Sequence, residues 1–226
     1  MNRVSSILRM HLRDKFTWFF VPLLVVGSSF LVNYVLSFFM EEPLYTGGSA
    51  SLYVYMFITG ILSLAQTFPF AIGLSVRRTD FFLGTLYMAA VMSAIIAIFH
   101  LLLSWIEVSS GGWGTDLHFF DLPYLNEGMV IEQFWTYFII SLTMYFGGFI
   151  ISSVYRRFGM VGMITFSLVS LVLITIVVFL LSYYGWWGDM FSVIFSQSAS
   201  QLANWLVILL AINIGVSYVF IRKATV

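Results

Sequence analysis

The side chains that could carry chemistry are sparse in this chain of 226 residues. Its three histidines, His11, His100 and His118, are scattered, whereas a helical zinc-protease site needs two histidines on one face with an acid nearby. Cysteine is absent, which excludes disulfides, zinc–cysteine sites and a cysteine nucleophile. The chain also lacks the Gly-x-x-x-x-Gly-Lys-Ser/Thr loop, so we expect no P-loop binding of ATP by the chain itself.

Two other polar combinations do not form a recognisable catalytic site. Glu41 and Glu42 are adjacent, but they lack the following arginine and the membrane histidines of prenyl-protein proteases. Ser75 has no histidine placed to activate its hydroxyl group. We therefore expect that the chain is not an enzyme and that it holds no metal or cofactor. An intramembrane hydrolase is a third and disfavoured hypothesis.

The composition indicates that most of the chain is surrounded by lipid. Hydrophobic residues make up 61% of the sequence and charged residues 9%. Soluble domains contain roughly 45–50% apolar and about 25% charged residues. A water-soluble globule of this size could not bury so much apolar surface, so the sequence predicts an integral membrane protein.

The elements that position any functional residue are long apolar segments. A helix needs about 20 apolar residues to cross the hydrocarbon core of a bilayer, and β-barrel strands would show short alternating patterns that are absent here. The sequence predicts an all-α fold, a polytopic bundle of six transmembrane spans forming a single domain over residues 1–226. The predicted spans are residues 18–39, 53–74, 81–104, 134–154, 159–183 and 202–221.

The charges alternate between the connectors of these spans. All ten Lys and Arg residues lie in the terminal segments or in the connectors 76–80 and 155–158, where Asp14 and Asp80 are the only acids. The remaining acids fall in the other three connectors. The positive-inside rule then places both termini in the cytoplasm of a multi-pass protein of the cell membrane.

Residues 1–17 have apolar side chains at helical spacing, with basic side chains at other positions. This pattern favours an amphipathic helix in the cytoplasmic headgroup layer over an ordinary basic tail. Its predicted residues are Arg3, Ile7, Leu8, Arg13 and Phe16. We interpret the first apolar segment as an uncleaved span, because it is too long for a signal peptide.

Polar and small residues inside the spans are typical of helix packing. We expect Asn33, Gln66, Asn213 and His100 to form hydrogen bonds between helices rather than to bind a substrate. Ser141, Gly148 and Ser152 lie on one side of the fourth span and indicate close helix approach. Pro69 is expected to kink the second span, because its ring removes a backbone hydrogen bond.

The most distinctive segment is the basic turn 73–84, which carries Arg77 and Arg78 followed by Thr79, a candidate helix cap, and the pair Phe81-Phe82. The simplest interpretation is a tight turn that obeys the positive-inside rule. The arrangement also indicates a rigid corner that presents charge to a soluble partner.

With its basic amphipathic start, six spans and this turn, the chain resembles the small six-span permeases of ABC-2 type exporters. The resemblance implies a cytoplasmic ABC ATPase dimer, which binds ATP and Mg²⁺, and a second permease chain, the same or related, as partners. No nucleic acid is expected, and lipid surrounds the spans. The resemblance implies ATPase coupling through Arg77, Arg78, Thr79, Asp80 and Phe81, with the N-terminal segment as a second contact and Arg156 and Arg157 as a third.

The connector 105–133 is predicted to be an acidic loop on the outside. Its acids are Glu107, Asp116, Asp121, Glu127 and Glu132. Charge asymmetry explains them most simply, and a lid that attracts cationic amphiphiles is the alternative. The leading functional hypothesis is an exporter permease driven by a separate ATPase. The alternative hypothesis is a membrane sensor or assembly protein that anchors a cytoplasmic regulator.

Overall fold

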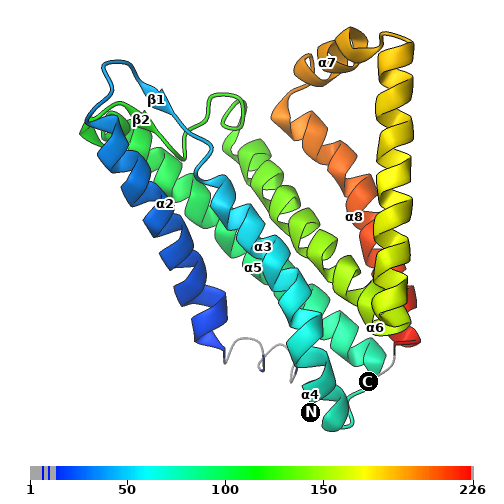
Figure 1. Cartoon of the computed structure of the whole chain (residues 1–226). Helices are drawn as coiled ribbons and strands as arrows, with labels where there is room; N and C mark the ends of the chain where they lie inside the picture. The colour runs from blue at the N-terminus through cyan, green and yellow to red at the C-terminus, as the bar shows by residue number, and fades with distance from the viewer. Residues whose placement is uncertain (1–6, 8–9, 11–13, 225–226) are drawn as a thin grey trace.

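The computed structural model describes residues 7, 10 and 14–224, and it is an all-α structure of long helices (Figure 1). Two short π-helical segments, η1 and η2, and a 3-10 turn, η3, accompany the α-helices. The elements in chain order are η1 (Phe16–Phe20), α2 (Val21–Ser37), β1 (Leu44–Tyr45), α3 (Ala50–Leu62), η2 (Ser63–Thr67), α4 (Phe68–Gly73), α5 (Arg78–Ser109), η3 (Gly112–Gly114), β2 (Leu117–His118), α6 (Val130–Tyr183), α7 (Trp187–Phe195) and α8 (Ala199–Arg222).

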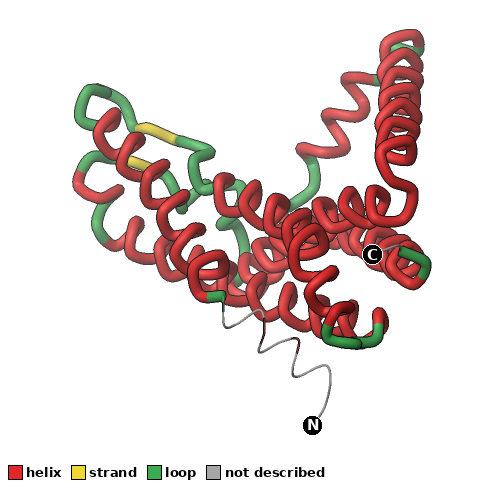
Figure 2. Tube along the Cα trace, turned by 60° about the horizontal axis from the view of Figure 1, so that its bottom comes forward, coloured by secondary structure: helices red, strands yellow, loops and turns green. Residues whose placement is uncertain are grey.

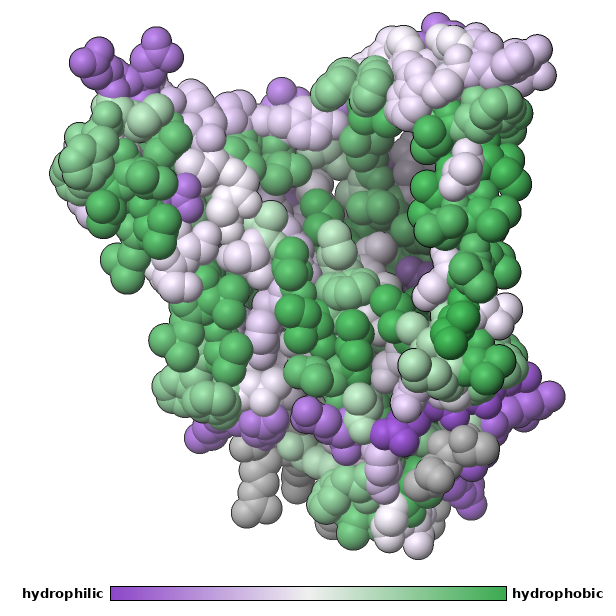
Figure 3. Space-filling view, viewed as in Figure 1, coloured by the Kyte–Doolittle hydropathy of each residue, from purple (hydrophilic) through white to green (hydrophobic). Residues whose placement is uncertain are grey.

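The long helices are suited to a bilayer. Among the described residues, five continuous helices are long and apolar enough to cross a membrane: Phe16–Ser37, Ala50–Gly73, Arg78–Ser109, Val130–Tyr183 and Ala199–Arg222. Their apolar side chains cover much of the visible surface between the two ends (Figure 3). The loops gather at the ends of the helices (Figure 2). These features indicate a membrane protein.

The fourth and fifth predicted spans belong to α6, which changes direction at Gly159. This residue has φ 66° and ψ −158°, a backbone conformation that glycine adopts readily because it has no Cβ atom. The two arms, residues 130–158 and 160–183, meet at the lower end of the bundle (Figure 1). The predicted connector 155–158 is helical, so the change of direction is confined to a single residue.

Other boundaries also differ from the sequence prediction. Helix α5 runs from Arg78 to Ser109, beyond both predicted ends. The predicted outer connector 184–201 contains helix α7, which sequence analysis missed because the segment is short and flanked by glycine and serine. A two-residue parallel pairing of β1 with β2 ties the outer connector before α3 to the outer connector 105–133.

Most of the predicted N-terminal interfacial helix lies outside the described residues, including Arg3, Leu8 and Arg13. Ile7 is 3% exposed and belongs to the main hydrophobic cluster, whereas an interfacial position would leave it in lipid. Phe16 is 65% exposed at the start of η1. The interfacial helix therefore stays a prediction.

The predicted small-residue face of the fourth span is confirmed as a packing face. Ser141, Gly148 and Ser152 are buried on the first arm of α6. At Gly148 a Cβ atom would collide with the Phe57 carbonyl oxygen of α3, and at Gly60 it would collide with the Tyr145 carbonyl oxygen of α6. The two glycines thus allow the backbones of α3 and α6 to approach closely, as in other membrane helix pairs.

Candidate functional site

The basic side chains gather at one end of the bundle, where the 74–77 turn, the Gly159 turn and the end of α8 lie together. We call this the basic end, and the opposite end, with β1, β2 and α7, the acidic end. Figure 3 shows hydrophilic atoms as a band across the lower part of the visible face. The residues that form the basic end are Arg77, Arg78, Arg156, Arg157, Arg222 and Lys223.

The predicted corner is a tight turn between α4 and α5. Ser75 has φ 59°, in the left-handed region that non-glycine residues enter rarely. Its amide donates to the Ile72 carbonyl at 2.9 Å, and the amide of Val76 donates to the Ala71 carbonyl at 3.1 Å. These bonds close the end of α4 and direct the chain into α5 within a few residues.

The five predicted coupling residues differ in their exposure and in their contacts. Arg77 is exposed at the N-cap position of α5, whereas Arg78 donates to the Arg222 carbonyl at 2.9 Å and so ties the corner to the end of α8. Thr79 does not cap the helix, because α5 has already begun at Arg78. Asp80 lies in the first turn of α5, where a negative charge interacts favourably with the helix dipole and stabilises the helix.

Phe81 has a packing role. Its side chain is fully buried, and its ring lies 5.3 Å from that of Phe68 in an edge-to-face arrangement. This contact fixes α4 against the start of α5. Phe81 therefore stabilises the corner from inside and does not present a surface to a partner.

The tip of the corner is apolar, which sequence analysis did not anticipate. Phe70 is 60% exposed and Leu74 is 62% exposed. Helix α4 is the lowest labelled helix in Figure 1, and Figure 3 shows apolar atoms there below the hydrophilic band. Two large exposed apolar side chains beside the cations of the basic end are unusual at the end of a membrane bundle, which normally faces water.

Arg156 links α6 to η2 at the basic end. Pro69 has no N–H group to donate to the Ala65 carbonyl, the partner it would have in a regular α-helix. The Arg156 Nη2 atom donates to that carbonyl at 2.5 Å. The π-helical segment η2 ends just before Pro69, and Arg156 of α6 bonds to the carbonyl oxygen that Pro69 leaves without a backbone donor. The kink at Pro69 stays a prediction.

Arg157 points to the other side, toward α8. Its guanidinium lies 4.8 Å from the ring centre of Phe158 and 5.1 Å from that of Phe220. Its Nη1 atom donates to the Val219 carbonyl at 3.4 Å. The two arginines that were predicted to be a third contact for the ATPase thus both brace α6 against neighbouring helices.

At the acidic end, Glu107 organises the connector between α5 and α6. It lies inside α5, fully buried, and not in an exposed loop as predicted. Its Oε1 atom accepts from the amides of Phe119 and Asp121 at 2.9 and 2.8 Å. Its Oε2 atom accepts from Trp113 Nε1 at 2.7 Å and from the Phe120 amide at 3.0 Å. Every donor belongs to the connector, so this carboxylate holds the loop onto the helix.

The other predicted acids have separate positions. Asp116 and Glu127 are exposed, and Asp121 is half-buried. Glu132 lies in the first turn of α6 and accepts from the Met129 amide at 3.1 Å, so it caps the helix. An acidic lid could therefore use the carboxylates of Asp116, Glu127 and, in part, Asp121, because those of Glu107 and Glu132 are occupied.

His100 lies fully buried beneath the same connector. Its Nε2 atom is 3.2 Å from the Phe120 carbonyl, and its Nδ1 atom is 3.3 Å from the Tyr53 hydroxyl. Since a carbonyl only accepts, hydrogen on Nε2 satisfies both contacts with a neutral ring. The ring stacks on Tyr137 at 4.1 Å. These contacts agree with the predicted role of His100 in holding helices together and leave neither nitrogen for catalysis.

A network of hydrogen-bonded side chains continues from the ring of Tyr137, which stacks on this histidine. The Tyr137 hydroxyl donates to Asn126 Oδ1, and Asn126 Nδ2 donates to Asp121 Oδ1 at 2.5 Å and to Ser104 Oγ at 3.0 Å. Asn126 was not predictable from the sequence, because an asparagine in a long connector carries no spacing signal. The network fixes the connector over the ends of α3, α5 and α6.

Comparison with protein-family models, curated proteins and solved structures finds no significant match to this chain.

Proposed function

We propose that the chain is the membrane permease of an ATP-binding-cassette exporter, driven by ATP hydrolysis in a separate cytoplasmic ATPase. The observation that supports this most is the corner between α4 and α5. It combines an exposed apolar tip at Phe70 and Leu74 with the exposed cation Arg77. The inner side of the corner is fixed by the packing of Phe81 on Phe68 and by the hydrogen bond of Arg78 to α8. A protein partner can bury such a tip, and a rigid corner can transmit the displacement that the partner imposes.

The same corner is joined mechanically to the rest of the bundle. Arg78 links it to α8, and Arg156 links the residues just before α4 to α6. A force on α4 would thus reach α8 and the first arm of α6. The exposed apolar faces of α2 and of the arm 160–183 provide surface for lipid and for a second permease chain, the same or related.

We further propose six crossings with both termini in the cytoplasm. Each arm of α6, at about 1.5 Å per residue, exceeds the roughly 30 Å of the hydrocarbon core. A change of direction at Gly159 returns the chain to the acidic end, where α7 lies (Figure 1). This arrangement puts the basic end on the cytoplasmic side, in accord with the positive-inside rule.

The crossing number can be measured by cysteine labelling, since the chain has no natural cysteine. We expect Glu42→Cys and Asp189→Cys to react with a membrane-impermeant maleimide on intact cells. We expect Met160→Cys and Lys223→Cys to react only after the membrane is opened. A straight α6 would give five crossings and exchange the results for Asp189→Cys and Lys223→Cys.

The partner can be tested by purifying the full chain in mild detergent and identifying bound proteins by mass spectrometry. We expect an ATPase of the cassette type to be retained. Arg77→Glu and Leu74→Asp should each reduce its recovery at least about tenfold, because they place negative charge on the contact surface. Glu42→Arg, a charge reversal at the acidic end, is the control and should leave recovery unchanged.

Two results would contradict parts of this proposal. If wild-type chain is recovered from detergents and lipid nanodiscs without an ATPase, the permease hypothesis is wrong and the sensor or assembly role is favoured. If the ATPase is retained equally by Arg77→Glu and Leu74→Asp, the contact lies elsewhere than the α4–α5 corner.

A further inference from the structure

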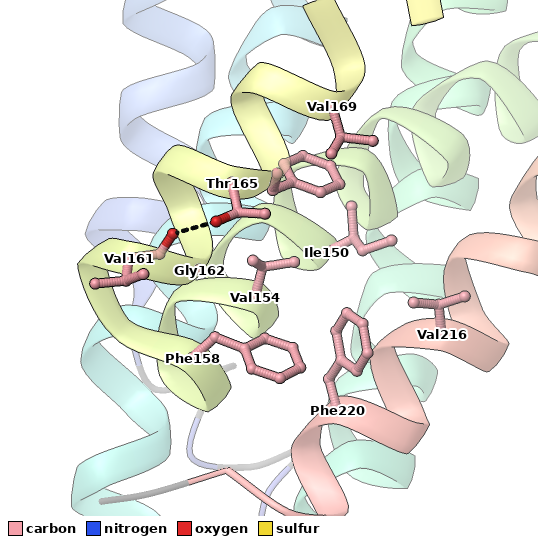
Figure 4. Close-up of a pocket in the computed structure, with 10 residues that line it drawn as sticks. Ile150, Val154, Phe158, Val161, Gly162, Thr165, Val169, Val216 and Phe220 are labelled. Atoms are coloured by element: carbon pink, nitrogen blue, oxygen red, sulfur yellow. Dashed lines mark hydrogen bonds between the residues drawn. The ribbon is translucent and has the colours of Figure 1, made fainter. Parts of the chain in front are cut away.

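An apolar groove lies between the two arms of α6 and α8, close to the Gly159 turn. Its volume is about 540 Å³, which falls within the range of roughly 300–1,000 Å³ typical of small-molecule pockets. Figure 4 shows side chains from both arms and from α8 facing this space. The residues used below are Ile150 and Val154 of the first arm, Thr165 and Val169 of the second, and Val216 and Phe220 of α8.

The groove offers almost no polar contact along its length. The hydroxyl of Thr165 donates to the Val161 carbonyl one turn earlier at 2.9 Å, as the dashed line in Figure 4 shows. The other lining residues named above are hydrocarbon. An occupant of this part of the groove must therefore be apolar, such as an acyl chain.

One end of the groove, at Phe158 and Phe220, carries the positive charge of Arg157; we call this end the base of the groove. The guanidinium of Arg157 stacks against Phe158 and Phe220, which both line the groove. Of its five N–H donors, one makes a hydrogen bond within the described residues, at 3.4 Å to the Val219 carbonyl. Arg222 and Lys223 follow at the C-terminal end of α8, and the Arg222 guanidinium lies 5.8 Å from the Tyr218 ring.

We infer that the groove binds an anionic phospholipid, with an acyl chain along the apolar wall and the phosphate at Arg157. A lipid satisfies both halves of the site at once, because its phosphate accepts hydrogen bonds where the acyl chain begins. Arginine is well suited to phosphate, which it can bind through two parallel N–H groups. Basic pockets between membrane helices bind anionic headgroups in this manner.

A second copy of the chain fits the site less well. Two parallel copies in one membrane would bring their basic ends to the same depth, so the base of the groove would face further cations. A phospholipid phosphate at that depth instead neutralises Arg157. The binding itself does not depend on the ATPase, and only the leaflet follows from the proposed orientation, which makes it the cytoplasmic one.

The test is lipid binding to the purified full chain, measured by native mass spectrometry during titration. The two probes are phosphatidylglycerol and phosphatidylcholine with identical acyl chains. We expect one phosphatidylglycerol to bind in preference to phosphatidylcholine. Arg157→Gln, which removes the charge and keeps a polar donor, should weaken phosphatidylglycerol binding about fivefold and remove the preference.

A second variant tests the apolar half of the site. Thr165→Phe fills the groove and should reduce binding of both lipids. Thr175→Phe is the matched control, because Thr175 makes the same kind of bond, to the Leu171 carbonyl at 2.9 Å, on the same arm outside the groove. Arg77→Gln is the control for loss of a cation at the basic end.

Two outcomes would overturn the inference. One is an unchanged phosphatidylglycerol preference in Arg157→Gln together with equal lipid binding by Thr165→Phe and Thr175→Phe. The other is loss of a dimer in Thr165→Phe with no change in bound lipid, which would assign the groove to a second copy. Neither outcome bears on ATPase recovery, so failure here is distinct from failure of the proposed function.

Discussion

Replacing Glu107 with glutamine should destabilise the protein by about 2–4 kcal/mol, because the substitution sets donors against donors in a buried site. Each carboxylate oxygen accepts from two donors of the connector. A glutamine has one accepting oxygen, so its NH₂ group faces two N–H donors in either orientation. We expect a clearly lower midpoint of unfolding in detergent.

Glu127→Gln is the control for this prediction, since Glu127 is exposed in the same connector. It should change stability by less than about 0.5 kcal/mol, as most surface substitutions do. If Glu107→Gln unfolds at the wild-type midpoint, Glu107 does not hold the connector in the way described.

Replacing Gly148 with alanine should cost about 1–3 kcal/mol or more, because the new methyl group meets backbone and not a movable side chain. A Cβ atom there would collide with the Phe57 carbonyl oxygen, so α3 and α6 must separate to admit it. The loss of close packing along this crossing should lower the unfolding midpoint of the purified protein.

The neighbouring Gly147 supplies a matched control. A Cβ atom there would lie 3.6 Å from the Phe57 ring, an ordinary contact distance. Gly147→Ala should therefore be tolerated, and Gly60→Ala should repeat the effect of Gly148→Ala, because its Cβ atom would meet the Tyr145 carbonyl oxygen. Equal stability of the Gly147 and Gly148 variants would show that the two helices are not held at this distance.

The long helices were predictable from the sequence because lipid imposes a simple rule on it. Apolar runs of about 20 residues are required wherever a helix crosses hydrocarbon. The continuous helices Phe16–Ser37, Ala50–Gly73, Arg78–Ser109 and Ala199–Arg222 therefore lie close to predicted spans. The small-residue face containing Gly148 was also predictable, because close approach of helices requires small side chains at regular spacing. The crossing number stays a prediction.

The candidate site was predicted only in part. The corner residues 73–84 stood out by their charge, and the structure confirms a tight turn there. Sequence position could not show that Phe81 points inward to Phe68, or that Phe70 and Leu74 project outward. Both orientations depend on how α4 packs against α5, which no local pattern encodes.

The sequence by itself indicated that lipid surrounds the long helices and that basic and acidic residues lie in alternate connectors. Both follow from composition and from order along the chain. Only the tertiary structure decided what those charges do. Glu107 became the anchor of a connector, and Arg156 the partner of a carbonyl that Pro69 leaves unbonded. The physical reason is that burial requires each polar group to find a partner, and such partners lie far apart in sequence.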